Sequence, residues 1–121
     1  MNYRLVEHAQ NSYIETQAGD GRIEKESDAL DLIGGLAEYQ IHRIMLHDAD
    51  LSEDFYNLRT GLAGAVLQKF AQYSVKVAAV LPREKAEEGR FGEMVLEANR
   101  RNRLFHVFEE RDQAEAWLVG D

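Results

Sequence analysis

The chain has 121 residues, a length that suits one domain with a single hydrophobic core. Its residues are 45% hydrophobic and 30% charged, which is the composition of an ordinary folded protein and argues against disorder. The absence of cysteine excludes disulfides, thiolate nucleophiles and thiolate metal sites.

Most of the net charge of −8 comes from the amino-terminal half of the chain. Residues 1–60 contain 12 Asp or Glu and 5 Lys or Arg, whereas residues 61–121 contain 10 and 9. Proteins that bind nucleic acids usually neutralise phosphates with a basic surface, so this charge argues against a nucleic-acid partner. A cationic partner or a divalent ion suits the acidic half better.

Hydrophobic runs in the chain are short. Residues 1–8 lack the apolar core of a signal peptide, and apolar runs such as residues 77–81 are too short to cross a bilayer. We therefore expect a soluble, cytoplasmic protein with no membrane partner. No cofactor is expected, because the sequence contains no complete cofactor or catalytic motif.

The first 17 residues predict a β-hairpin. Residues 3–8 and 13–17 alternate apolar and polar side chains, and the segment between them is rich in turn formers. Ile23 is expected to continue the strand pattern, and Ser27 or Asp28 to cap the first helix.

The remaining elements alternate between strands and helices, as judged from the period of their apolar residues. In chain order we predict a helix ending near residue 39, a strand over 43–47, a helix over 55–70, a buried strand over 75–81, a charged loop or loose helical turn over 83–90, a helix through 91–98, a strand over 104–108 and a last helix capped by Asp112. The order β-β-α-β-α-β-α-β-α predicts one α/β domain over residues 1–121, with a single mixed, mostly parallel sheet.

One family resemblance covers nearly the whole chain. It rests on a helix start at residues 28–32 and on the run Phe55-Tyr56-x-Leu58-x-Thr60-Gly61-Leu62-Ala63-Gly64-x-x-Leu67-Gln68-Lys69-Phe70. These residues resemble the bacterial family called domain of unknown function 4180. That resemblance implies no known activity.

A more distant similarity is to the STAS domains of anti-sigma-factor antagonists, which share the predicted element order. Residues 60–64 are similar to their Ser-Gly-Leu-Gly-like signature at the start of the helix after the third strand. This resemblance implies that Thr60 is phosphorylated by a partner kinase, that Gly61 makes the tight helix start and that Leu62 docks on the partner.

Two glycines within a predicted helix need a physical reason, because each costs about 1 kcal/mol relative to alanine. Gly61 and Gly64 have two interpretations. They allow the helix to pack closely against the sheet, or they leave a helix start open to a phosphate or a partner.

Acidic residues collect where the predicted strand over 43–47 ends. His47, Asp48 and Asp50 are candidate ligands for a divalent ion, because oxygen ligands suit Mg²⁺ or Ca²⁺ and a histidine admits Mn²⁺ or Zn²⁺. The alternative interpretation is that these acids, with Glu53 and Asp54, offset the dipole of the following helix.

The leading hypothesis is a non-catalytic regulatory or protein-interaction module that docks through residues 48–64. Thr60 and Ser52 are the candidate phosphoacceptors, and Phe55 and Tyr56 the candidate aromatic patch. The alternative is a small ligand- or metal-binding protein, or an enzyme, that uses the acidic cluster. A homodimer through a strand edge or the aromatic patch is compatible with either.

Overall fold

The sheet has five strands in the order β1-β2-β3-β4-β5. In this computed structural model, which describes residues 1–17, 19 and 21–120, the first two strands form an antiparallel hairpin and the later ones join in parallel. The strands are β1 (Asn2–Val6), β2 (Tyr13–Gln17), β3 (Arg43–His47), β4 (Lys76–Val80) and β5 (Phe105–Phe108). The prediction of a mixed, mostly parallel sheet is therefore confirmed.

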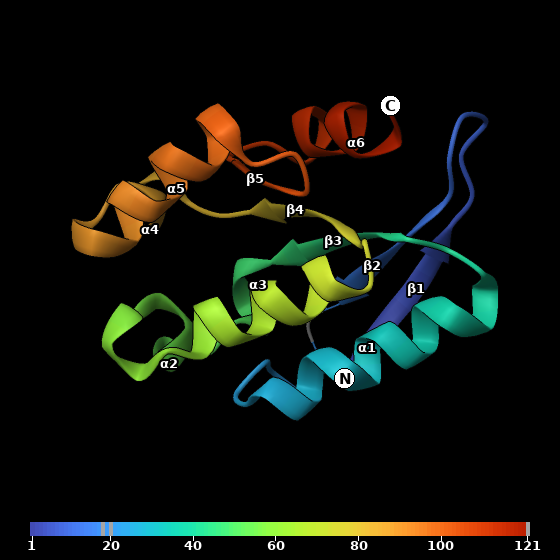
Figure 1. Ribbon diagram of the computed structural model, residues 1–121. Coiled ribbons are helices and arrows are strands. Elements are labelled where there is room, and N and C mark those ends of the chain that lie inside the picture. Colours follow the sequence, from blue (N-terminus) through green and yellow to red (C-terminus); the bar gives the residue numbers. More distant parts are fainter. Residues whose placement is uncertain (18, 20, 121) are drawn as a thin grey trace.

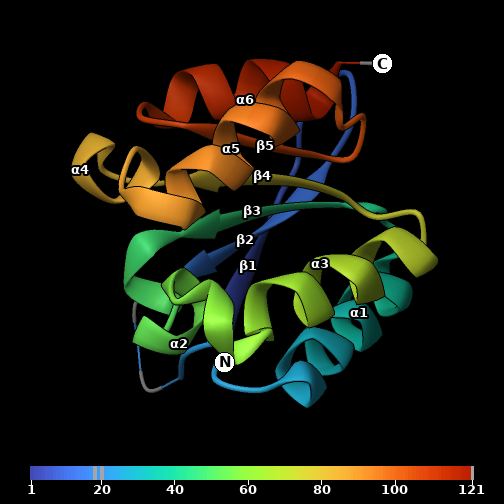
Figure 2. The ribbon, with the colours of Figure 1, turned by 60° about the vertical axis from the view of Figure 1, so that its left-hand side comes forward.

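Three long helices cover one face of the sheet and the last helix covers the other. The first group is α1 (Glu26–Tyr39), α3 (Leu62–Gln72) and α5 (Gly89–Arg101), and the last helix is α6 (Arg111–Val119). Figure 2 shows α6 across the sheet from α1 and α3. Because each parallel strand lies beside its predecessor, right-handed connections put all three crossover helices on the same face.

Alternation along the central strand fills both layers of the core. Ile44 and Leu46 of β3 point to the layer of three helices, and Met45 points to α6. All three are fully buried, as expected for a strand that is covered on both faces. The described helices include none long and apolar enough to span a membrane.

The predicted helix over 55–70 is wrong, because the chain breaks it into three pieces. These are α2 (Glu53–Tyr56), the 3-10 turn η2 (Leu58–Thr60) and α3. Asn57 adopts an extended conformation between the first two, and its side-chain oxygen accepts the Arg59 amide at 3.1 Å. Gly61 then takes a left-handed conformation with φ of 77°, which starts α3 in a new direction.

Two predicted helix caps and one predicted strand extension also differ from what the structure shows. Helix α1 begins at Glu26, and the Asp28 carboxylate reaches back to the amides of Glu24 and Lys25. Asp112 lies within the first turn of α6 and does not cap it. Ile23 forms a single bridge with the residue that follows a 3-10 turn, η1 (Asp48–Asp50), and is not part of the hairpin.

The two edges of the sheet differ. The outer edge of β5 is covered by its neighbouring helix, where the Asn99 side chain bonds both the amide and the carbonyl of Val107 and the Asn102 oxygen accepts the Phe105 amide. Such covering prevents another strand from pairing there. A homodimer built through a strand edge would therefore use β1.

Helix α6 is held on the sheet by polar contacts at both of its ends. At its start, the Arg111 guanidinium makes a two-point contact with the Glu15 carboxylate at 2.8 and 2.9 Å. At its end, Arg43, Lys76 and Asn11 donate to the last carbonyls, which suits the negative end of the helix dipole.

Glu15 is a buried acid on which three side chains converge. Arg4 and His47 bond the same carboxylate as Arg111, and Glu15 is only 5% exposed. Burial alone would raise the pKa of Glu15, but the hydrogen bonds from these three side chains outweigh it and lower the pKa to about 2.

Stability should therefore depend on pH through Glu15. A lowered folded-state pKa gives a contribution that is complete above the ordinary pKa of 4.5 and is lost as the pH falls towards 2. We expect Glu15→Gln to lower the free energy of unfolding by about 2–4 kcal/mol at pH 7, because it removes the buried counter-charge shared by the partly exposed Arg4 and Arg111 and weakens their hydrogen bonds. Urea unfolding from pH 7 to pH 3 checks this, with exposed Glu7→Gln as the control. A difference between Glu15→Gln and the natural protein that stays constant down to pH 3 would contradict the expectation.

Candidate functional site

A cavity of about 600 Å³ opens beyond the carboxyl ends of β3 and β4. Helix α2 and η2 form one wall of this groove, and the short helix α4 (Arg83–Ala86) with the first turn of α5 forms the other. Figure 1 places α2 and α4 at this same end of the molecule. Open α/β sheets commonly bind ligands at this edge. The residues that line the groove are Glu53, Tyr56, Asn57, Leu58, Arg59, Lys85, Glu88, Gly89, Arg90 and Phe91.

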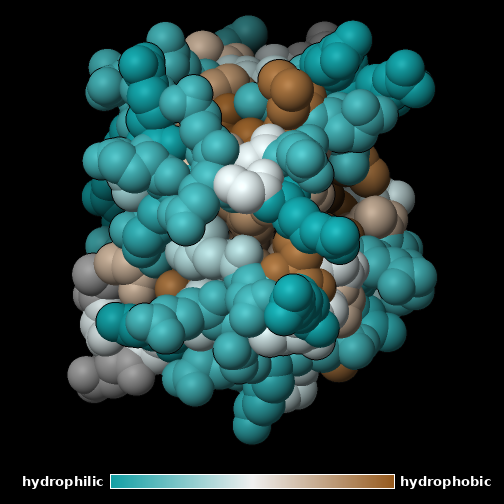
Figure 3. All heavy atoms as spheres, turned by 90° about the vertical axis from the view of Figure 1, so that its left-hand side faces the viewer, coloured by the Kyte–Doolittle hydropathy of each residue, from teal (hydrophilic) through white to brown (hydrophobic). Residues whose placement is uncertain are grey.

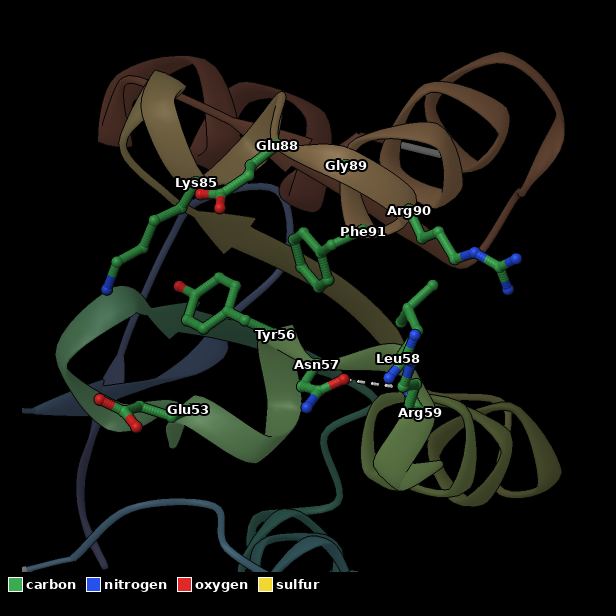
Figure 4. A pocket seen from close by; sticks show the side chains of 10 residues that line it. All are labelled: Glu53, Tyr56, Asn57, Leu58, Arg59, Lys85, Glu88, Gly89, Arg90 and Phe91. Atoms are coloured by element: carbon green, nitrogen blue, oxygen red, sulfur yellow. Dashed lines mark hydrogen bonds between the residues drawn. The ribbon is translucent and has the colours of Figure 1, made fainter.

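The middle of the groove is aromatic. The rings of Tyr56 and Phe91 lie 4.9 Å apart, and Figure 4 shows them between the two walls. Phe55 packs behind them in edge contact with both rings and is buried in the core. Of the two aromatics predicted as a patch, Tyr56 therefore lines the groove and Phe55 does not. Figure 3 shows apolar surface on this side of the molecule between hydrophilic side chains.

One carboxylate joins the two walls of the groove. The same oxygen of Asp48 accepts the Tyr56 hydroxyl at 2.5 Å and the Lys85 ammonium at 2.7 Å. The ammonium also lies 4.8 Å from the centre of the Tyr56 ring. A smaller cavity of about 180 Å³ continues past this contact towards Arg22 and Leu51.

The charges around Asp48 fix its protonation state. Burial alone would raise the pKa of Asp48, but the hydrogen bonds from Lys85 and Tyr56 outweigh it and lower the pKa. Burial and the Asp48 carboxylate both raise the pKa of Tyr56. At neutral pH, Tyr56 is therefore a fixed hydrogen-bond donor to an ionised acid.

Two arginines flank the groove at its other end. Figure 4 shows Arg59 and Arg90 on the side away from Lys85, Glu53 and Glu88. Within residues 1–17, 19 and 21–120, neither guanidinium forms an ion pair. Both side chains are exposed.

Thr60 lies next to the groove and not within its lining. Its hydroxyl donates to the carbonyls of Asp54 and Asn57, at 2.6 and 2.9 Å, and accepts the Leu62 amide at 3.2 Å. These bonds close the turn between η2 and α3. Thr60 is exposed, whereas Leu62 is buried in the core and does not face a partner.

The two predicted glycines have different roles from each other. Gly61 provides the left-handed turn before α3, and Gly64 is exposed with no neighbour close to the position that a side-chain carbon would take. Neither glycine brings α3 closer to the sheet, so the interpretation as close helix packing is wrong for both.

The predicted metal ligands point in three directions. His47 faces α6 and bonds Glu15 at 2.6 Å, Asp48 faces the groove, and Asp50 is fully buried. Across the part of the chain that the structure describes, no three His, Asp or Glu side chains are arranged to hold a metal ion.

The segment 50–52 holds polar atoms without hydrogen-bond partners. Both carboxylate oxygens of Asp50 and the hydroxyl of Ser52 are buried and unpaired among the described residues. Burial raises the pKa of Asp50, although the Thr16 hydroxyl and His47 oppose that effect. The buried Ser52 hydroxyl is out of reach of a kinase in this conformation.

The sequence pattern revealed one wall of the groove and missed the other. Residues 48–64 include the lining from Glu53 to Arg59, but the wall from Lys85 to Phe91 was interpreted only as a charged loop or turn and a helix start. The sequence did contain a signal for this second wall. Pro82 ends the strand that precedes this wall, so the wall follows a carboxyl end at the same sheet edge as His47.

A family model matches residues 8–118, a range that includes both walls of the groove. The chain belongs to the family described as Domain of unknown function (DUF4180). The predicted membership of DUF4180 is thus confirmed, and the family description gives no activity. No curated protein matches the chain, and no solved structure matches it.

We expect substitution by alanine to have opposite effects on stability at the two glycines near Thr60. Gly61→Ala should lower the free energy of unfolding by about 1 kcal/mol, because a side chain opposes the left-handed conformation. Gly64→Ala should raise it by up to about 1 kcal/mol, because alanine favours the helix and the added carbon meets nothing. Urea unfolding of both variants checks this. Changes of the same sign would contradict the assignment of Gly61 as the turn and Gly64 as an ordinary helical position.

Proposed function

We propose that the domain is a non-catalytic protein-interaction module whose groove docks a segment of a protein partner. The observation that supports this proposal is the open cavity of about 600 Å³, in which Tyr56, Leu58 and Phe91 are flanked by charged side chains of two walls. Aromatic residues and arginine are enriched where proteins bind one another.

The shape and lining of the groove favour an extended segment as its occupant. The walls come from two separate connections of the sheet, so the groove runs across the surface and not into the core. The Tyr56 ring is fixed by its bond to Asp48 and by its contact with Phe91. Docking on a fixed ring costs little side-chain entropy, which favours binding.

Thr60 is the proposed control point of docking. A phosphate on the hydroxyl of this exposed residue would remove the bonds to the carbonyls of Asp54 and Asn57 and would add about −1.5 to −2 charges. Thr60 follows Arg59, a groove residue, so the change would alter the wall beside it. The buried Ser52 hydroxyl makes Thr60 the better candidate.

Selection of peptides tests docking directly. We expect a displayed library of random twelve-residue peptides to yield binders that lose affinity at least tenfold for Glu88→Trp, which fills the groove. Glu84→Trp is the matched control, because Glu84 is an exposed residue of α4 that does not line the groove. Fluorescence anisotropy measures both affinities. Binders that tolerate Glu88→Trp as well as Glu84→Trp would overturn the proposal.

The control point has its own test. Thr60→Glu should abolish binding of the selected peptides and leave the circular dichroism spectrum unchanged, because the residue is exposed and outside the core. Thr60→Ser is the matched control, since it keeps a hydroxyl. Unchanged peptide binding by Thr60→Glu would remove Thr60 from the proposal.

A small ligand is the second candidate occupant, because the cavity volume lies within the usual range for such sites. A thermal-shift screen of small molecules tests it, since a ligand that prefers the folded state raises the melting temperature. Hits whose shift disappears in Glu88→Trp would favour this candidate. Absence of such hits would set it aside.

A further inference from the structure

We infer that the segment docked in the groove carries acidic side chains, and that Arg59 and Arg90 bind their carboxylates. This inference rests on the proposed function and adds the chemical class of the partner. It depends on how charge is distributed along the groove, which the sequence did not reveal.

The groove has a different charge at each of its ends. At one end, Lys85 is paired with Asp48 at 2.7 Å, and Glu53 and Glu88 lie on the same side. At the other end lie Arg59 and Arg90, one from each wall, on the side away from the two acids of the lining. The end with Lys85 is therefore acidic in sum, and the opposite end is basic.

Whether a cation of the groove already has an acidic partner within the protein decides whether it can bind a ligand. The Lys85 ammonium is already used, because it holds Asp48 and lies over the Tyr56 ring. Arg59 and Arg90 form no ion pair within the described part of the chain. A ligand carboxylate could thus bind these two guanidiniums without displacing an internal partner.

Guanidinium chemistry suits this recognition. Each guanidinium presents paired N–H donors that match the two oxygens of a carboxylate. The aromatic pair, Tyr56 and Phe91, lies between the basic and the acidic ends. The expected segment therefore has an aromatic or aliphatic residue for the rings and Asp or Glu for the arginines.

The sequence of the selected peptides gives the first readout. Binders that depend on the groove should be enriched in Asp and Glu, and replacing those residues by Asn and Gln should weaken binding at least tenfold. Affinity should also fall as salt rises from 50 to 300 mM, because salt screens exposed charges.

Paired variants give the second readout. Arg59→Gln with Arg90→Gln should weaken binding of an acidic peptide at least tenfold. Arg100→Gln with Arg103→Gln is the matched control, because it removes the same charge from exposed positions outside the groove lining. Arg59→Glu with Arg90→Glu should reverse the preference, so that a fresh selection yields basic peptides.

The two proposals fail in different ways. Groove-dependent peptides without acidic enrichment, bound equally by the arginine double variant, would overturn this inference and leave the docking function standing. Peptides that ignore the groove-filling variant would overturn the docking function itself.

Discussion

The groove depends on one carboxylate that is shared by its two walls. Asp48 follows β3 and accepts hydrogen bonds from Tyr56 of α2 and from Lys85 of α4. These three residues belong to separate elements, and each wall is otherwise a short helical segment. The bond from Tyr56 to this ionised acid is partly buried and stronger than a neutral one, so it orients the Tyr56 ring, and the more exposed bond from Lys85 links the second wall to the same carboxylate.

A second buried carboxylate organises the opposite face of the sheet. Glu15 binds Arg111 and thereby holds the start of α6, while His47 bonds the same carboxylate from the end of β3. The two adjacent residues His47 and Asp48 thus serve opposite faces. This division explains why the acids after β3 do not gather into a metal site, although they are close in sequence.

The sequence predicted the fold well because the spacing of apolar residues distinguishes strands from helices. The hairpin and the buried run of β4 follow directly from alternation and from an unbroken apolar stretch. The break between α2 and α3 was missed, since apolar residues such as Phe55, Leu62 and Phe70 keep a helical spacing across it. A side-chain bond from Asn57 and the left-handed Gly61 produce the break, and neither has a periodic signal.

The site was only half predictable for a related reason. A single residue pattern marked residues 48–64, but a groove needs two walls, and the second comes from a charged segment that carries no motif.

NMR measures the central claim most directly, by following the amide signals of the labelled protein during titration with a selected acidic peptide. The account predicts shifts concentrated at residues 56–59 and 85–91, with α6 and the hairpin unchanged. Shifts concentrated on α6 or the hairpin, with the groove unaffected, would contradict it.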